Sequence, residues 1–304
     1  MEHKRIITVL ICVLVASCVI VSGYVISINR ESRYLPDKSV EDIVKILADE
    51  NISIDPQLIS TKTEVGNVYI CGSPEEYSST VAGLIEDCGV RYSFAVPDGD
   101  IIIMTNGARF EFGSEFSFRY SENGEEVSLP TRDNLPQMST PLSEKTKNEI
   151  SKIAAEFLDR GSESFGGSDH ISIITDVENV WENSGSFYAF CTRKIDDTPV
   201  SDNAVMCEIK NGKVVSAYGT WSFLTPGESY PAQLTDSLNI LFSVKKELAG
   251  SGKSVAIESI RRCYSLYTYG EKEELCLIPC WQIVTDNAGE FVYNAIDSTL
   301  YTKY

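Results

Sequence analysis

The stretch AVMCEIKNGKVVSAYG, residues 204–219, predicts the basic unit of this fold, a β-hairpin. Apolar and polar side chains alternate on both sides of Asn211-Gly212. An Asn-Gly pair readily adopts the two positive φ angles of a type I′ turn, and this turn joins two antiparallel strands directly. We therefore expect this part of the chain to be antiparallel sheet.

Similar strand patterns surround other turn signals in the chain. Residues 91–107 predict a hairpin around Asp98-Gly99, although Pro97 beside this turn complicates its type. Alternation in residues 110–129 ends at a second Asn-Gly pair, Asn123-Gly124. Near the C-terminus, two β-rich runs flank Asn287-Ala288-Gly289. Most of the strands are thus expected to pair with their neighbours in the sequence.

Cys276 and Cys280 lie four residues apart in LCLIPCWQIVTD and raise the question of a metal or redox site. On one strand they would face the same side about 13 Å apart, at ~3.3 Å per residue. This separation exceeds the ~7 Å Cα limit for a disulfide and is awkward for two ligands of one metal ion. Pro279 between them marks an edge strand or a bulge. We interpret the segment as a strand, and we expect no metal and no cofactor.

Amphipathic periodicity predicts helices over residues 39–50, 73–89, 143–161 and 235–250. Strand patterns outnumber these helices and turn directly on one another. The predicted fold class is therefore α+β, with antiparallel sheets and helices packed on one face.

The polar segment 121–144 contains three prolines and predicts a domain boundary. A membrane-proximal α+β domain is expected over residues 36–130, and a C-terminal α+β domain over residues 143–304. The C-terminal part repeats the order helix then strands, over 143–223 and again over 235–304, which suggests two related halves.

Residues 6–28 contain no charged side chain and are long enough, as a helix, to span a hydrocarbon core of ~30 Å. We expect a single transmembrane helix here, with residues 1–5 as a cytoplasmic tail. The predicted location is the cell membrane, single-pass, with an extracytoplasmic ectodomain. Two cleaved alternatives are a signal peptide, for which the apolar segment is too long, and a lipoprotein lipidated at Cys18 within VASC.

The predicted membrane helix has a stripe of mostly small residues. Cys12, Ala16, Val19 and Gly23 recur at i, i+4, i+7 and i+11. Small residues let two helix backbones approach closely in lipid, so we predict a partner-binding face here, although small residues are common in any membrane helix.

The formal net charge is −18, and such a surface repels phosphate backbones, so nucleic acid is excluded as a partner. The chain also contains nine cysteines. A chain of this size does not need disulfides for its stability, so we interpret the cysteines as reduced core residues, with redox sensing left open.

The sequence contains no recognisable catalytic motif. His3 and His170 are the only histidines, and nothing local supports a pair of Cys191 with His170. The segment GSESFGGS, residues 161–168, lacks the spacing and the lysine of a phosphate-binding loop. Paired carboxylates of a glycoside hydrolase would come together only in space, so a cell-wall hydrolase stays open as an alternative. Our expectation is that the protein is not an enzyme.

Three segments carry a resemblance to a known family. They are SVEDIVKILADENISIDPQLIS from residue 39, NAVMCEIKNGKVVSAYGTWSFL from residue 203, and LIPCWQIVTDNAGEFVYNAID from residue 277. In order and pattern they resemble the first helix, the central hairpin and the closing hairpin of the YycI/YycH family of Gram-positive bacteria. The closing hairpin also resembles PepSY-type modules.

The first resemblance implies a membrane-anchored, non-enzymatic regulatory protein of a two-component system. Such a protein would bind a sensor histidine kinase that governs cell-wall metabolism, through membrane helix and ectodomain, and modulate its activity. A paralogous regulator would be a further partner. The second resemblance implies an alternative function, an anchored or lipidated PepSY-like module that restrains a secreted peptidase.

Overall fold

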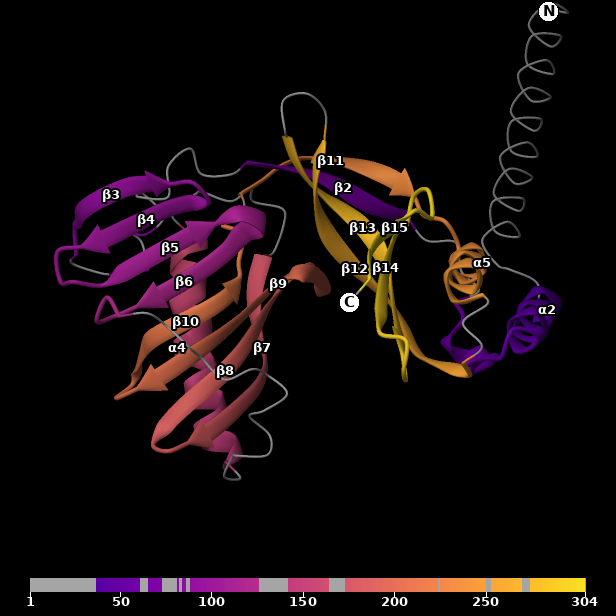
Figure 1. The fold of residues 1–304 in the computed structure, drawn as a ribbon, viewed down its shortest axis with the longest axis horizontal. Coiled ribbons are helices and arrows are strands. Elements are labelled where there is room, and N and C mark those ends of the chain that lie inside the picture. The colour runs from indigo at the N-terminus through magenta and orange to yellow at the C-terminus, as the bar shows by residue number, and fades with distance from the viewer. Residues whose placement is uncertain are drawn as a thin grey trace, which may run out of the picture. The chain divides into compact units, whose positions relative to one another are not determined.

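The computed structural model describes residues 37–60, 65–72, 81, 84, 85, 88–125, 142–163, 173–223, 225–249, 253–269 and 274–303. The chain divides into two compact units that interleave along the sequence (Figure 1). Unit 1 comprises the described residues within 1–66, 231–261 and 280–304; unit 2 comprises those within 67–230 and 262–279. The sequence-based division was into consecutive stretches, 36–130 and 143–304.

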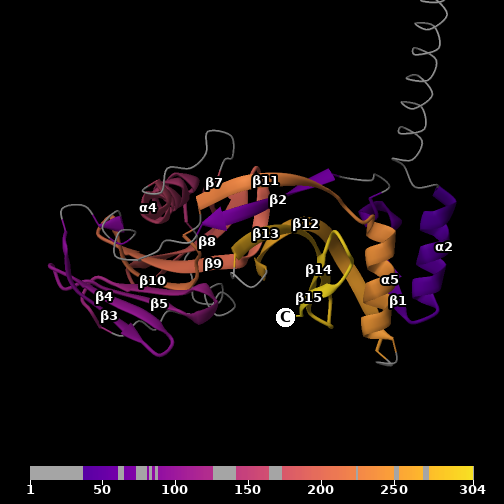
Figure 2. The ribbon, with the colours of Figure 1, turned by 90° about the horizontal axis from the view of Figure 1, so that it is seen from above.

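Unit 1 combines helices with a small sheet. Its elements are α2 (Asp37–Ala48), β1 (Ile52–Ile54), the 3-10 helix η1 (Pro56–Leu58), α5 (Ser237–Leu248), β14 (Glu290–Asn294), β15 (Leu300–Lys303) and parts of β12 (Val255–Tyr269) and β13 (Glu274–Thr285). Figures 1 and 2 show α2 and α5 side by side. The helices predicted over 39–50 and 235–250 are confirmed.

The core of unit 1 lies between these helices and the strands. Ile43 and Leu47 of α2 pack in one cluster with Leu241 of α5 and Trp281 of β13. The Trp281 indole N–H donates to the Thr235 carbonyl oxygen at 3.0 Å, which satisfies its polar atom inside the core. This hydrogen bond ties β13 to the residues that lead into α5.

In its described residues, unit 2 is built around a long antiparallel sheet and the helix α4. Its main strands are β3 (Val90–Val96), β4 (Gly99–Met104), β5 (Arg109–Gly113), β6 (Ser117–Ser121), β7 (Ile173–Asn183), β8 (Ser186–Ile195), β9 (Thr198–Lys210) and β10 (Lys213–Thr220). The 3-10 helix η2 (Ser114–Phe116) joins β5 to β6, β2 (Val65–Gly72) and β11 (Thr225–Gln233) are further strands, and α4 spans Glu144–Glu163. The helix predicted over 143–161 is thus confirmed.

The order of these strands across the sheet is β7-β8-β9-β10-β6-β5-β4-β3, and every adjacent pair is antiparallel. The predicted hairpin over 204–219 is confirmed as β9 and β10, with Asn211 at φ 53° and Gly212 at φ 77°. Positive φ angles also occur in the turns Ser184-Gly185 and Asp196-Asp197. Because type I′ turns follow the natural twist of the strands, these tight turns keep β7 to β10 in sequence order.

One face of this sheet is the core of unit 2. Figure 2 shows α4 lying over β8, β9 and β10. Ala154, Phe157 and Leu158 of α4 are buried in one cluster with aromatic and aliphatic side chains of the strands, including Phe110 and Val205. We call the opposite side of the sheet of unit 2 its outer face.

The predicted fold class is wrong. It combined α+β architecture and purely antiparallel sheets with a transmembrane helix, whereas the described residues are mostly strand and their sheet is mixed. Parallel pairs join β1 to β12 at Ile52↔Val255, and β12 to β9 at Tyr264↔Val200. Turn signals report only antiparallel neighbours, and a parallel pair needs a long crossover that leaves no local signal.

The predicted single-pass location in the cell membrane, with a cytoplasmic N-terminus and an extracytoplasmic ectodomain, is not supported by the helices of the described residues. Within the described ranges, no helix is both long and apolar enough to span a bilayer. The longest, α4, has 20 residues but carries charged side chains in every turn. Residues 6–28, where the anchor was predicted, lie outside the described part, as does the 1–5 tail.

Candidate binding surface

The outer face of unit 2 follows from the alternation of side chains along each strand. Phe110 and Phe112 of β5 are buried on the core face, so Arg109 and Glu111 between them lie on the outer face. The same alternation puts Arg119 on the outer face of β6, between the buried Phe118 and Tyr120.

Cross-strand register lines these outer side chains up in two rows. The first row contains Phe94, Ile101, Glu111, Arg119, Tyr218, Met206 and Phe190, each directly opposite the next. The second row contains Tyr92, Ile103, Arg109, Ser121, Ser216, Glu208, Tyr188 and Trp181. Directly opposed residues have Cβ atoms about 5 Å apart, so each row is a continuous line of neighbouring side chains.

Large aromatic side chains are exposed along these rows. Tyr92 is 56% exposed, Phe94 44% and Tyr218 44%. At the other end of the rows, Trp181 and Met206 form a small cluster with Tyr188 and Phe190. An antiparallel sheet with one solvated face normally presents polar residues there. Exposed aromatic side chains that lie in line are instead typical of protein-binding surfaces.

Arginine side chains lie between the aromatic residues. Arg109 contacts Glu111 at 2.6 Å, and Arg119 reaches the same carboxylate at 3.7 Å. The Arg119 guanidinium also lies 5.1 Å from the ring centroid of Tyr218. Two arginines therefore share one glutamate, which leaves this part of the outer face positive in a chain of net charge −18. Arginine next to exposed tyrosine is the composition found at energetically important interface positions.

Glu208 organises the polar centre of the second row. Its carboxylate accepts from Ser216 Oγ at 2.9 Å and contacts Lys210 Nζ at 2.7 Å. Partial burial alone would raise the pKa of Glu208, but the hydrogen bonds from Lys210 and Ser216 lower it below its ordinary value. Burial, with the neighbouring Glu208 charge, raises the pKa of Tyr188. These shifts keep Glu208 charged and Tyr188 neutral, which fits a fixed polar contact.

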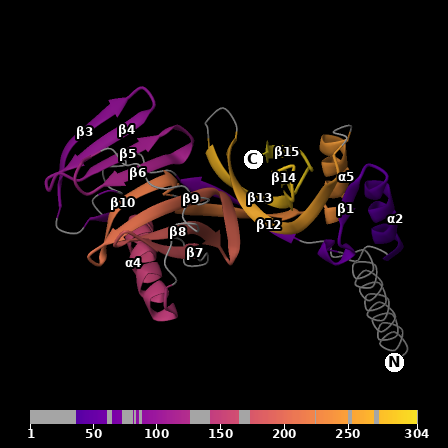
Figure 3. The same ribbon diagram turned by 60° about the horizontal axis from the view of Figure 1, so that its bottom comes forward.

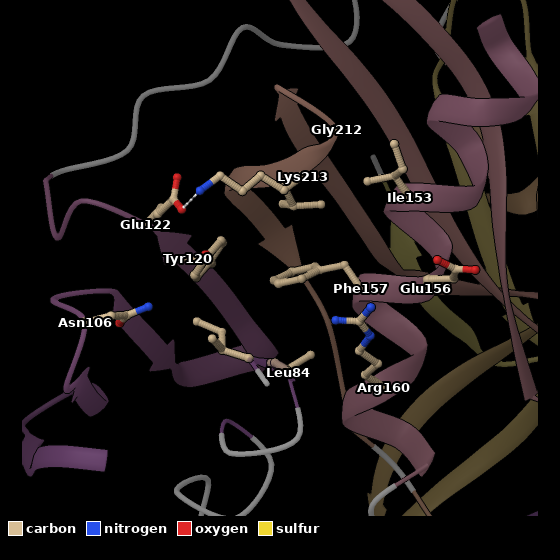
Figure 4. Close-up of a pocket in the computed structure, with 12 residues that line it drawn as sticks. Leu84, Asn106, Tyr120, Glu122, Ile153, Glu156, Phe157, Arg160, Gly212 and Lys213 are labelled. Carbon is tan, nitrogen blue, oxygen red and sulfur yellow. Dashed lines mark hydrogen bonds and ion pairs between the residues drawn. The ribbon is translucent and has the colours of Figure 1, made fainter. Parts of the chain in front are cut away.

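A pocket of about 260 Å³ lies between α4 and strands β6 and β10, away from the outer face (Figure 4). The Tyr120 and Phe157 rings lie 5.0 Å apart beside it, and Lys213 forms an ion pair with Glu122 at its rim. The lining also contains Glu156, so two carboxylates share the pocket.

The cysteines of the described residues are not in disulfides, and all but Cys88 are buried. Burial raises the pKa of Cys71 to about 12. A hydrogen bond with Cys207, together with burial, raises the pKa of Cys191 well above its ordinary value. Nucleophilic or metal-binding cysteine needs the thiolate, so these shifts disfavour both roles.

Cys276 and Cys280 both lie on β13, which confirms that the segment is a strand. Across the described residues, no group of His, Cys, Asp and Glu side chains could hold a metal ion. His170, imagined as a partner of Cys191, lies outside the described part of the chain. The predicted partner-binding stripe of Cys12, Ala16, Val19 and Gly23 also lies outside it, so that stripe stays a prediction.

Sequence reasoning missed a buried arginine. Arg193 of β8 is 1% exposed, donates to the Ser222 carbonyl oxygen and lies 4.5 Å from the ring centroid of Trp221. Burial lowers the pKa of Arg193 to about 10, although Asp159 opposes this shift. The guanidinium thus anchors the chain that leaves β10. The sequence could have indicated this burial, because strand alternation places Arg193 on the same face as the buried Ala189 and Cys191.

Comparisons with known proteins add no function. No protein-family model matches the chain, and no curated protein matches it. Among solved structures, the chain is similar to a crystal structure of an uncharacterized protein from Eubacterium rectale ATCC 33656. The two share 11% identity with a TM-score of 0.49, over 87% of this chain and 99% of the other.

Proposed function

We propose that this protein is a non-catalytic regulatory protein that binds a sensor histidine kinase and modulates its activity. The identity of the partner rests on the resemblance of residues 39–60, 203–224 and 277–297 to the YycI/YycH family. The observation that supports binding to a protein is the outer face of unit 2, with Tyr92, Phe94 and Tyr218 exposed.

The outer face suits a protein partner better than a small molecule. Its side chains lie in rows across many strands of an open sheet face. A protein surface can cover such rows, whereas a small molecule would need an enclosed site. A partner that covers Tyr218 would also desolvate the arginine stacked on it, which strengthens a cation–π contact to about 2 kcal/mol. Aromatic and arginine side chains of this kind contribute most of the binding energy at protein interfaces.

Regulation of a kinase by such a surface needs little energy. If the bound protein contacts one of the two states of the kinase better than the other, it shifts their equilibrium. A difference of about 1–3 kcal/mol changes the population ratio by roughly 5- to 150-fold. The outer face can supply this difference through a few aromatic contacts.

A pull-down followed by a kinase assay tests the proposal. The tagged full chain is the bait in a detergent extract of its own cells, captured proteins are identified by mass spectrometry, and the captured kinase is assayed for autophosphorylation with and without the chain. To test whether the outer face makes the contact, a triple variant replaces its exposed rings, Tyr92, Phe94 and Tyr218, by serine. Phe242→Ser is the control, because Phe242 is 48% exposed but lies on α5 of unit 1.

The proposal expects a sensor histidine kinase with the native chain and with Phe242→Ser, and a loss of about tenfold or more with the triple variant. Autophosphorylation should change when the native chain is added. If no kinase is captured, or if its activity does not respond, the proposal is wrong. Capture of a secreted peptidase in its place would favour the PepSY-like alternative.

A further inference from the structure

Strand β3 ends the strand order of unit 2, and β4 is its one strand neighbour among the described residues (Figure 3). From Val90 to Ala95 each residue of β3 is exposed, on both faces of the sheet. Natural proteins usually protect such an edge with charged residues, proline or a covering element, because its free backbone groups attract another strand. In β3 the protection is slight: a bulge between Val90 and Tyr92, and one charge, Arg91.

The backbone groups that face outward on β3 can be assigned. Met104 N–H bonds to the Ala108 carbonyl oxygen at 2.8 Å, so the even-numbered residues of β4 bond toward β5. In an antiparallel ladder the odd-numbered residues of β4 then bond toward β3. Ser93 is opposite Ile102, and Ala95 is opposite Asp100. The N–H and C=O groups of Ser93 and Ala95 therefore point away from β4.

The side chains of β3 specify what could pair with these groups. Tyr92 and Phe94 begin the two rows of the outer face, so an added strand would extend both rows by one position. Apolar side chains on that strand would cover these exposed rings. The Arg91 guanidinium lies 5.2 Å from the Tyr92 ring centroid and has no ion-pair partner among the described residues. A carboxylate on the added strand would neutralise it.

We infer that β3 accepts an extended acidic segment of a partner protein as an additional β-strand, and this inference rests on the proposed binding function. The segment bonds to the outward groups of Ser93 and Ala95, places apolar side chains against Tyr92 and Phe94, and presents a carboxylate to Arg91. A second copy of the chain fits less well, because its β3 would bring another arginine, and not a carboxylate, to this edge.

The test measures amide exchange in the full chain by NMR while a synthetic peptide is added. The peptide has about seven residues, in which valine alternates with threonine and glutamate. Ser93→Pro removes an outward N–H without removing a bond to β4, and proline is tolerated at such edge positions. Ser93→Thr is the matched control, because it keeps the N–H. Arg91→Glu reverses the charge and leaves the backbone unchanged.

The inference expects the peptide to slow exchange of the Ser93 and Ala95 amides about tenfold or more, with little change at Tyr92 and Phe94, which are already bonded. Ser93→Pro should abolish binding, Ser93→Thr should keep it, and Arg91→Glu should weaken it about two- to fivefold. A peptide with lysine in place of glutamate should also bind less well. No added protection at Ser93 and Ala95, or protection that depends on chain concentration without peptide, would overturn the inference.

Different results would contradict the kinase proposal and the strand-addition proposal. If the peptide protects Ser93 and Ala95 but no kinase is captured from cells, strand addition stands and the kinase proposal is wrong. If a kinase is captured equally well by the native chain and by Ser93→Pro, the regulatory proposal stands and the partner does not use β3.

Discussion

The two faces of the unit 2 sheet are made by the same strands but differ in how their aromatic side chains are used. On the core face, Phe110 and Tyr120 have ring centroids 4.8 Å apart and are almost fully buried. On the outer face, Tyr218 lies under the Arg119 guanidinium and is 44% exposed. Adjacent residues such as Phe118 and Arg119 thus belong to different environments.

Similar residues can therefore stabilise the fold on one face and remain available to a partner on the other. A ring that loses its contact with water on folding stabilises the folded chain, whereas a ring still exposed in the folded state has that gain left for a partner. The comparison therefore predicts opposite effects of mutations on the two faces.

The largest effect is expected on the core face. Phe110 is fully buried among Phe112, Phe118 and Tyr120, so Phe110→Ala should lower the free energy of unfolding by about 3–5 kcal/mol through lost burial and the cavity left behind. Urea denaturation followed by circular dichroism measures this loss. A loss below about 1 kcal/mol would mean that this face is not a packed core.

On the core face, the buried thiol of Cys191 predicts how the stability of the fold depends on pH. The hydrogen bond with Cys207 and burial raise the pKa of Cys191 well above 9.0, so the folded state holds this thiol neutral. Above pH 9 the unfolded chain releases the proton and the folded chain does not. The free energy of unfolding should therefore fall with rising pH, by up to about 1.4 kcal/mol per pH unit from this group.

Cys191→Ala should make that fall less steep, whatever the variant does to stability at neutral pH. Urea denaturation at a series of pH values between 7 and about 10.5 measures the slope. An unchanged slope would show that Cys191 does not titrate from a buried, neutral state.

The smallest effect on stability is expected on the outer face. Tyr218→Ala removes an exposed ring and its contact with Arg119, which should cost no more than about 1 kcal/mol in urea denaturation. The same variant should weaken capture of the partner much more than Phe110→Ala changes it at temperatures where both chains are folded. A loss of several kcal/mol on Tyr218→Ala would place this ring among the stabilising contacts and break the comparison.

The parts of the fold that sequence could predict are those decided by neighbouring residues. The turn at Asn211-Gly212 and the hairpin closed by Val96↔Gly99 follow from residues that favour tight turns. At Gly99 the fit is strict, because φ is 148° and an added Cβ would lie 1.8 Å from the Phe112 carbonyl oxygen. The helices α2, α4 and α5 were equally visible, because their apolar stripes repeat at helical spacing.

Partners distant in sequence could not be predicted. Residues 110–129 indicated a hairpin closed at Asn123-Gly124, yet β6 pairs with β5 and β10, with Ser121 opposite Arg109 and Ser216. The parallel pair of β1 with β12 joins residues that lie about 200 positions apart, as Ile52↔Val255 shows. These strand pairings depend on how distant parts of the chain pack together, so a pattern of neighbouring residues cannot predict them.

The sequence by itself determined the alternation within each strand and the turns between neighbours, since both depend on residues within a few positions of one another. Only the tertiary structure decided the strand order, and with it the outer face. Tyr218, Arg119 and Phe94 come from separate strands, and they form a row because the register of the sheet brings them into line. Register is a property of paired strands, so it exists only once the chain has folded.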